Sequence, residues 1–427
     1  MSHSQNWLPP YFTYKGGQLH IEKVSLDAIA VEFGTPCYVY AANSIREAYN
    51  RYQTAFAEAE LDLSLCYAVK ANSNLAILRL LSRLGAGADV VSGGELFRAN
   101  AAGIPPAKIV FAGVGKTAAE IDFALTKHIR AFNIESAGEL ALIEQRAQAS
   151  STLSIAISIR CNPDVAADTH PYITTGTNNN KFGVTFAQAR ELAGYIARSD
   201  VLQLHALQMH IGSQLLTIQP LAEAFRRLLI LAAQVEEQTG QPLKYLDIGG
   251  GLGVRYTDEV PAQPAALAQA IGEIMAAHGR YYPLVAEPGR YLVAEAGTLL
   301  TQVLYLKSQA EVNFAIVDAA MNDLLRPALY QAKHQIVPLL EGQNIGKQTY
   351  EVVGPVCESG DWLGHEVNLP KLESGARLAI LSAGAYGFAM ASNYNSRLRP
   401  AEVLVDGNRV ELIRRRETFE DLIAAEL

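Results

Sequence analysis

Short apolar strands alternate with longer helical stretches over more than half of this 427-residue chain. Between the strands, apolar residues recur at helical spacing, as at Leu75, Leu78 and Leu81. Such alternation is typical of a parallel sheet with helices on both faces, and eight units over this length predict an α/β fold of the (β/α)8 TIM-like barrel type. The predicted strands are 63–69, 88–91, 109–112, 130–134, 154–159, 205–209, 244–248 and 283–287.

The pattern changes after residue 290, where helical periodicity fades and β-branched or alternating runs replace it. The runs are 312–318, 350–354, 376–381 and 402–406. They predict a second, mostly β domain of barrel or sandwich type, to which Leu19–Ile21 adds a strand. We therefore expect an N-terminal segment 1–35 belonging to the β domain, a barrel over 36–290 and a C-terminal β domain over 291–427.

Charge and cysteine usage exclude several classes of function. The net charge is −8, and the one short basic run, Arg414–Arg416, stands next to an acidic tail and is expected to be a solvated face, so nucleic acid is not an expected partner. The four cysteines are scattered and form no C-x-x-C pair, which argues against a metal site and suits a reducing compartment. No signal-peptide pattern and no apolar run of about 18 residues is present, so we expect a cytoplasmic protein without a membrane partner.

Lys70 directly follows the first predicted strand, in the stretch L-S-L-C-Y-A-V-K-A-N (63–72). A lysine is rarely buried unless a partner or a reaction uses it. In a (β/α)8 barrel, chemistry lies at the carboxyl ends of the strands, where Lys70 stands. The alternative is a surface lysine whose stem lies along the protein.

Other polar residues also lie on, or directly after, predicted barrel strands. Asp89 lies on the second strand, His210 follows the sixth, and Glu287 and Arg290 follow the eighth. Singly, each has an ordinary structural explanation, such as a core histidine, a turn cap or an ion pair. Together with Lys70 they would gather at one rim of the barrel.

The loop after the seventh strand reads D-I-G-G-G-L-G (247–253). Glycines let backbone amides approach an anion, and this loop is a recurrent phosphate site in such barrels. A dinucleotide fingerprint is excluded, because it would need Gly or Ala at Val254 and a βαβ frame. A flexible turn remains an alternative.

A lysine, a phosphate loop and a carboxylate on one cavity suggest a cofactor with a carbonyl group and a phosphate. Pyridoxal 5′-phosphate fits, with Lys70 as its Schiff base and Glu287 near the pyridine nitrogen.

The motifs Y-A-V-K-A-N, H-I-G-S-Q, D-I-G-G-G-L-G, E-P-G-R and G-P-V-C-E-S-G-D occur in this order along the chain. In this the chain resembles the diaminopimelate decarboxylases, a family of the alanine-racemase-like (fold-type III) pyridoxal phosphate enzymes. The resemblance covers nearly the whole chain. Each motif is shared with relatives, but the ordered set is specific.

The resemblance implies roles for the matching positions. Lys70, Cys357 and His210 would be catalytic, with Cys357 donating a proton after the carboxyl group leaves and His210 stacking on the cofactor ring. The implied cofactor-binding residues are Lys70, Asp89, His210, Ser213, Gly250, Gly251, Glu287, Pro288, Gly289, Arg290 and Tyr386. The implied substrate-binding residues are Arg290, Arg326, Tyr330, Glu358 and Tyr386.

The resemblance also implies the reaction and the assembly. Meso-2,6-diaminopimelate would be decarboxylated to L-lysine and carbon dioxide, the last step of lysine biosynthesis. Cys357 and Glu358 would enter the active site of the neighbouring subunit, which implies a homodimer with shared sites. The stretch 169–183 matches a loop near the site in the family, although an ordinary polar surface loop remains an alternative.

Four other functions stay open on sequence grounds. A related decarboxylase would act on ornithine, arginine, D-lysine or carboxynorspermidine, but C-E-S-G-D is the diaminopimelate form. An alanine racemase would carry an arginine in place of Glu287. A non-catalytic regulatory homologue would be expected to lack Lys70 or Cys357. A stand-alone barrel that only carries the cofactor would lack the β domain.

Overall fold

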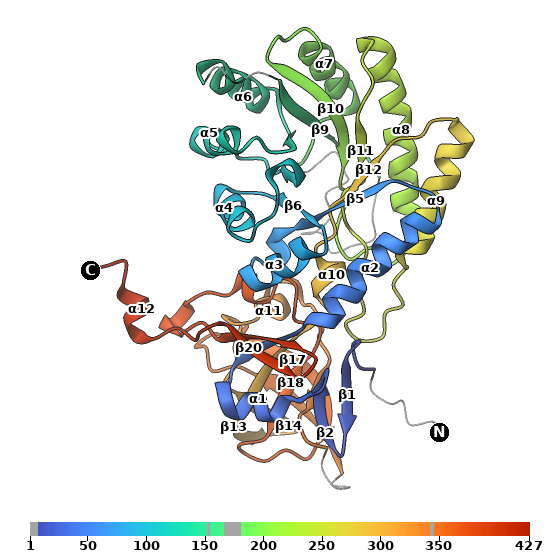
Figure 1. The fold of residues 1–427 in the computed structure, drawn as a ribbon. Helices are drawn as coiled ribbons and strands as arrows, with labels where there is room; N and C mark the ends of the chain where they lie inside the picture. Colours follow the sequence, from blue (N-terminus) through green and yellow to red (C-terminus); the bar gives the residue numbers. More distant parts are fainter. Residues whose placement is uncertain (1–6, 151, 153, 166–180, 342–345) are drawn as a thin grey trace. The chain divides into compact units, whose positions relative to one another are not determined.

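The structure is a computed structural model that describes residues 7–150, 152, 154–165, 181–341 and 346–427. The chain divides into two compact units (Figure 1). The barrel unit comprises Ala48–Gly253 and Val260–Tyr291, and the β unit comprises Met1–Glu47, Val254–Glu259 and Leu292–Leu427. In the described part of the chain, no helix has both the length and the apolar character needed to cross a bilayer.

The barrel unit is a closed ring of eight parallel strands, in the order β10-β11-β12-β5-β6-β7-β8-β9. This confirms the predicted (β/α)8 barrel, and each predicted strand is present. Their bounds are β5 (Leu63–Ala68), β6 (Gly87–Val90), β7 (Ile109–Phe111), β8 (Ala131–Ile134), β9 (Ile155–Cys161), β10 (Leu202–Met209), β11 (Tyr245–Asp247) and β12 (Leu284–Ala286).

Helices follow the strands and lie outside them (Figure 1). The helices are α2 (Ala42–Glu58), α3 (Leu75–Arg83), α4 (Gly93–Ala101), α5 (Ala118–Lys127), α6 (Ala137–Ala149), α7 (Phe186–Ile196), α8 (Gln219–Thr239), α9 (Pro264–His278) and α10 (Arg290–Val293). Several begin at a hydroxyl cap: the side chains of Ser92, Thr117, Ser136 and Thr185 each accept a hydrogen bond from a backbone amide three residues later. Such caps satisfy amides that the first helical turn leaves without partners.

The interior of the barrel has an apolar layer and a polar layer. The apolar layer is a buried cluster of Cys66, Val110, Ala206, Tyr245 and Val285. Side chains two residues apart point to the same face of a strand, so Asp247 follows Tyr245 inward and lies closer to the carboxyl end. The polar layer contains Asp89, Asn133, Ser158, Gln208 and Asp247, all buried.

The β unit is built on a mixed sheet of nine strands, which confirms the predicted second, mostly β domain. Its main path is β17-β16-β14-β13-β4-β19-β20, with β18 pairing both β13 and β15. The bounds are β4 (Cys37–Ala41), β13 (Gly297–Gln309), β14 (Val312–Val317), β15 (Ile336–Pro338), β16 (Lys347–Val353), β17 (Trp362–Pro370), β18 (Arg377–Ile380), β19 (Ala401–Asp406) and β20 (Arg409–Arg414). Three short helices complete the unit: α1 (Leu26–Phe33), α11 (Arg326–Tyr330) and α12 (Phe419–Ile423).

The N-terminal segment contributes more to the β unit than one strand. β1 (Phe12–Lys15), β2 (Gln18–Ile21) and β3 (Val24–Ser25) form a separate antiparallel sheet, and β2 supplies Leu19 and Ile21 to the core. The expected barrel range starts at residue 36, but β4 pairs antiparallel with β13 and parallel with β19. β4 is therefore a central, fully buried strand of the mixed sheet.

Candidate active site

Lys70 lies in a single 3-10 turn, Val69–Ala71, directly after β5. Its Nζ is 2.7 Å from Oδ2 of Asp89, on the neighbouring strand β6. The Lys70 side chain is 39% exposed, whereas the Asp89 carboxylate is fully buried. Oδ1 of Asp89 is buried and has no hydrogen-bond partner among the described residues. The amine is thus held by a buried carboxylate and remains accessible, which does not fit an ordinary surface lysine.

Glu287 follows β12 and is buried in the polar layer. Its Oε1 accepts a hydrogen bond from Nδ2 of Asn133 (3.1 Å), and its Oε2 accepts one from Nε2 of Gln208 (2.9 Å). Burial raises the pKa of Glu287 well above its ordinary value, and the Asp247 and Asp89 carboxyls raise it further. These carboxyls form a buried acidic cluster at the carboxyl end of the barrel.

The buried acidic cluster is suited to contact an aromatic ring that carries a positive charge. Burial also raises the pKa of Asp247, so the protein without a ligand disfavours full ionisation of the cluster. A protonated pyridine nitrogen near Glu287 would favour the charged carboxylate again. The unpartnered Oδ1 of Asp89 supports the same conclusion, because a buried polar atom without a partner is uncommon in a folded protein.

The raised pKa of Glu287 predicts an unusual pH dependence of stability. A carboxyl whose pKa is higher folded than unfolded holds more protons in the folded state, so stability falls as pH rises above the unfolded value. Cofactor-free Glu287→Gln should therefore gain stability over the cofactor-free parent between about pH 5 and 8. The amides of Asn133 and Gln208 can rotate to accept from the new amide, because their oxygens have no described partner.

Urea unfolding of the cofactor-free proteins at several pH values measures this difference. Glu273→Gln, at an exposed position on α9, is the matched control and should show no such trend. A constant difference between Glu287→Gln and the parent from pH 5 to 8 would contradict the assignment.

His210 directly follows β10 and contacts the glycine loop: the amide of Gly250 donates to its Nδ1 (3.3 Å). Burial, together with the Arg160 and Lys70 cations, lowers the pKa of His210 well below its ordinary value. The imidazole is therefore neutral at physiological pH, and a neutral aromatic ring is suited to stack on another ring.

The glycine loop approaches its neighbours too closely for any other residue. A Cβ on Gly249 would lie 2.2 Å from the carbonyl oxygen of Met209, and one on Gly250 would lie 2.4 Å from that of Glu287. Gly251 has φ +125°, a conformation that other residues rarely adopt. Backbone packing thus demands the glycines, which makes the loop a built cradle rather than a flexible turn.

A contact between Arg290 and Ser213 links the turn after β12 to the loop after β10, both at the carboxyl end of the barrel. The Nε and Nη2 atoms of Arg290 donate to Oγ of Ser213 at 3.1 and 3.0 Å. Gly289 keeps the E-P-G-R turn against the end of β5, since an added Cβ would lie 3.0 Å from the Cβ atoms of Ala68 and Ala71. The predicted residues that belong to these carboxyl-terminal loops and strand ends are Lys70, Asp89, His210, Ser213, Gly250, Gly251, Glu287, Pro288, Gly289 and Arg290.

The remaining predicted residues belong to the β unit. The buried guanidinium of Arg326 stacks over the Tyr256 ring at 4.3 Å, and its Nη1 lies 2.6 Å from Nε2 of His334. Nδ1 of His334 lies 2.8 Å from the carbonyl oxygen of Leu381, so Nδ1 donates there and Nε2 accepts from Arg326. A neutral histidine and an aromatic ring thus orient this arginine. Tyr330 ends the same short helix, α11.

Cys357 and Glu358 lie on an exposed loop of the β unit. The amide of Cys357 donates to Oδ1 of Asn395 (3.0 Å), and the hydroxyl of Tyr394 donates to Oε2 of Glu358 (2.7 Å). Tyr386 has φ +57°, which is costly for a bulky residue and typical of functional sites. In the stretch 169–183, residues 169–180 lie outside the described residues.

Sequence reasoning missed Asn133, Gln208 and Asp247, which surround Glu287. Each is a polar residue at or next to the carboxyl end of its strand, and Asn133 and Asp247 are the only charged or amide residues of theirs. That exception to an apolar run was a usable signal, because buried polar residues need partners.

Comparisons with known proteins agree on one family. Residues 42–294 match the model of the pyridoxal-dependent decarboxylase, pyridoxal binding domain. The diaminopimelate decarboxylase of Neisseria meningitidis serogroup A is 49% identical over 409 residues, covering 96% of this chain and 99% of that protein. A crystal structure of diaminopimelate decarboxylase from M. jannaschii in complex with L-lysine has a TM-score of 0.94 at 39% identity, covering 99% of both chains. The Helicobacter pylori enzyme complexed with L-lysine has a TM-score of 0.89 at 44% identity, covering 94% of this chain and 98% of that one.

Proposed function

Because the chain belongs to the pyridoxal-dependent decarboxylases, and among them to the diaminopimelate decarboxylases, we propose that it converts meso-2,6-diaminopimelate into L-lysine and carbon dioxide. The reaction is the last step of lysine biosynthesis. The single observation that carries this proposal is the accessible Lys70 amine, held by a buried carboxylate beside an acidic cluster and a glycine cradle. Bound pyridoxal 5′-phosphate supplies a conjugated ring that accepts the electron pair left on Cα.

Residues of the barrel unit, together with Tyr386 of the β unit, hold the cofactor. Lys70 would hold it through its aldehyde carbon, and Asp89 orients the Lys70 amine. The phosphate is held by the backbone amide of Gly251, by Ser213, and by the turn that contains Pro288 and Gly289, with Tyr386 as a further contact, while Gly250 shapes the loop and bonds His210. Support comes from the close packing of the glycines, which lines the loop with backbone and leaves no room there for side chains.

Glu287 and His210 control the electronic state of the ring. The Glu287 carboxylate would pair with the pyridine nitrogen and favour a proton there, which would make the ring a stronger electron acceptor. Neutral His210 stacks on the ring and adds no second cation. The amides of Asn133 and Gln208 keep Glu287 in place.

Cys357 donates the proton that returns to Cα after carbon dioxide leaves. Its thiol is exposed, whereas Cys37, Cys66 and Cys161 are buried, so it is the one cysteine of the four that can be presented to another molecule. We further propose that the enzyme is a homodimer in which Cys357 and Glu358 of one subunit complete the site of its partner. The scattered, free cysteines also fit a cytoplasmic enzyme.

Substrate selection rests on the distal end of meso-diaminopimelate, which carries one ammonium and one carboxylate. Arg290 and Arg326, with Tyr330 and Tyr386, bind the carboxylate, and Glu358 binds the ammonium. L-lysine lacks the distal carboxylate and would leave arginine charges unmatched, at a cost of several kcal/mol. The enzyme can therefore release its product without decarboxylating it again.

Replacement of Arg326 tests this selection. Arg326→Ala removes the guanidinium group that binds the distal carboxylate. It should therefore lower kcat/KM on meso-diaminopimelate on the order of 10²-fold or more. Cofactor affinity should change little, because Arg326 is not among the residues assigned to the cofactor. Steady-state kinetics with a parallel cofactor titration separate the two effects. Arg409→Ala, at an exposed position of β20, is the control. Equal losses of activity and cofactor affinity would contradict the assigned role.

Carbon dioxide release from meso-diaminopimelate by the cofactor-loaded protein tests the function itself. The enzyme should form L-lysine and carbon dioxide in equal amounts. The remaining alternative is a related decarboxylase, so ornithine, arginine, D-lysine and L-lysine serve as parallel substrates. Equal or faster turnover of any of these would replace diaminopimelate as the assigned substrate.

A further inference from the structure

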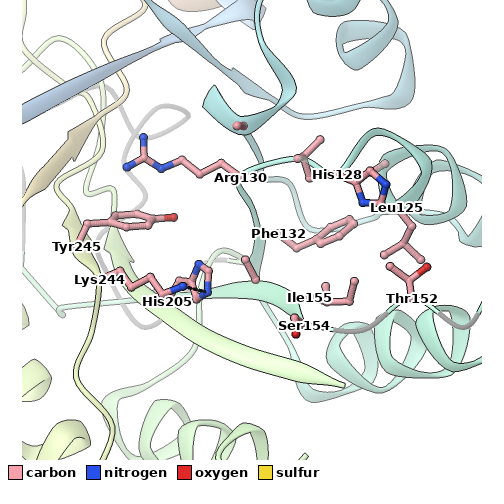
Figure 2. A pocket seen from close by; sticks show the side chains of 14 residues that line it. Leu125, His128, Arg130, Phe132, Thr152, Ser154, Ile155, His205, Lys244 and Tyr245 are labelled. Carbon is pink, nitrogen blue, oxygen red and sulfur yellow. Dashed lines mark hydrogen bonds between the residues drawn. The ribbon is translucent and has the colours of Figure 1, made fainter. Parts of the chain in front are cut away.

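A second pocket lies at the opposite end of the barrel from Lys70, where the strands begin. It has a volume of about 440 Å³. Arg130 precedes β8, Lys244 precedes β11, and Tyr245 is the first residue of β11. Figure 2 shows these side chains facing a common space with Phe132 and His205.

The pocket carries positive charge with no carboxylate in direct contact among the described residues, although the charge of Arg130 also acts on the buried Asp247 carboxyl further along β11. Its lining residues include no aspartate or glutamate. The Arg130 guanidinium stacks on the Tyr245 ring at 4.5 Å, and Nζ of Lys244 lies 2.7 Å from Nε2 of His205. Neither Arg130 nor Lys244 forms an ion pair with a carboxylate among the described residues. A partly buried cation without a counter-ion costs free energy, and an anionic ligand would reduce that cost.

His205 adds no further charge to the pocket. Burial and the neighbouring Lys244 and Arg130 cations lower the pKa of His205 to about 4. The neutral ring accepts a hydrogen bond from Lys244 and thereby holds that ammonium in place. The charge of the pocket is thus carried by Arg130 and Lys244, with His128 as a further exposed group at its edge.

The hydroxyl of Tyr245 is a second observation, separate from the charges, that indicates a ligand site. The residue is only 3% exposed, and its hydroxyl is buried without a hydrogen-bond partner among the described residues. The hydroxyl points toward the middle of the pocket (Figure 2). An unpaired buried hydroxyl is costly, so a ligand that accepts its hydrogen bond would gain affinity there.

The pocket is separate from the site around Lys70. The ring of Tyr245 belongs to the buried apolar cluster inside the barrel, together with Cys66 and Val285. The polar layer with Glu287 lies on the carboxyl-terminal side of that cluster. A ligand of the lower pocket would therefore not contact the groups assigned to decarboxylation.

We propose that this pocket binds a small organic anion with one carboxylate or phosphate group and an apolar body. The anionic group pairs with Arg130 and Lys244 and accepts the hydrogen bond of Tyr245. The apolar body lies against Phe132 and Ile155, both of which are buried and line the pocket.

Calorimetric titration of the cofactor-loaded protein tests the proposal with three probes of similar size: phenyl phosphate, phenylacetate and benzyl alcohol. The cofactor occupies the phosphate cradle at the other rim, and its visible absorption should stay constant during the titration. At least one of the two anions should bind in the millimolar range or tighter, and benzyl alcohol should bind at least ten-fold more weakly. The relative affinities of the two anions show whether phosphate or carboxylate is the preferred group.

Two variants and one control locate the binding. Arg130→Met removes the cation and should raise Kd about ten-fold or more. Tyr245→Phe should weaken binding while leaving thermal stability unchanged or higher, because the hydroxyl has no partner to lose. Lys127→Met removes an exposed charge from the end of α5, outside the pocket lining, and should leave Kd unchanged. Absence of binding by both anions, equal binding of benzyl alcohol, or affinities unaffected by both variants would overturn the proposal.

Discussion

Lys70→Ala should lose almost all decarboxylase activity, on the order of 10⁴-fold or more in kcat. In the proposed function the amine attaches the cofactor, and its ion pair with Asp89 holds it at the carboxyl end of the barrel. Lys116 cannot take its place, because its amine is buried and bound by Glu139 and by the carbonyl oxygens of Gly113 and Asn133. Carbon dioxide release under saturating cofactor is the measurement.

Two controls separate this loss from misfolding. Lys127→Ala changes an exposed lysine and should keep full activity. Lys70→Ala should still fold, because its side chain is only half-buried, although the Asp89 carboxylate then lacks its cation. A folded variant with activity within ten-fold of the parent would show that another residue attaches the cofactor.

The second large effect concerns Cys357. As a general acid it should contribute on the order of 10²–10⁴-fold to turnover, so Cys357→Ala should lose activity by that factor while cofactor binding is retained. Because the other three cysteines are buried, iodoacetamide should modify Cys357 first and inactivate the enzyme in step with that modification. Full modification of Cys357 without loss of activity would exclude the assigned role.

Mixing the two inactive variants tests the proposed dimer. If each site takes Lys70 from one subunit and Cys357 from its partner, a mixed dimer of Lys70→Ala and Cys357→Ala contains one intact site. Activity should then recover to as much as about a quarter of that of the parent after random subunit exchange, since half of the dimers are mixed and each has one intact site. No recovery despite demonstrated exchange would mean that each site is built within one chain.

The barrel could be predicted from the sequence because most of its strands are short, largely apolar and bounded by polar turns. A strand of a parallel barrel is covered on both faces, so its sequence is a near-continuous apolar run, as in Leu63–Ala68. The errors concern the ends of the strands. The strand predicted over 205–209 in fact begins at Leu202, as β10. Its start was placed too late because the exposed Gln203 interrupts the apolar run.

The position of β4 could not be predicted in the same way. The run C-Y-V-Y-A is as apolar as a barrel strand, and its partners β13 and β19 lie more than 250 residues away in the sequence. Periodicity identifies a strand but does not identify the strand with which it pairs.

The residues proposed to contact the cofactor could be named from the sequence more readily than the residues that position them. Lys70 and Glu287 stand at strand ends, where polar residues interrupt apolar runs. Asn133 and Gln208 were missed because their role depends on contact with Glu287 across the barrel interior. Likewise, nothing near Arg326 in the sequence indicates that Tyr256 stacks on it.

Borohydride reduction of the cofactor-loaded enzyme, followed by mass-spectrometric peptide mapping, tests most directly that the rim around Lys70 is the pyridoxal phosphate site. Reduction fixes the cofactor to the lysine that holds it. The mass increase should appear on the peptide containing Y-A-V-K-A-N, at Lys70, with full loss of activity. A label on Lys116 or any other lysine, or a fully inactivated enzyme without a label on Lys70, would contradict the assignment.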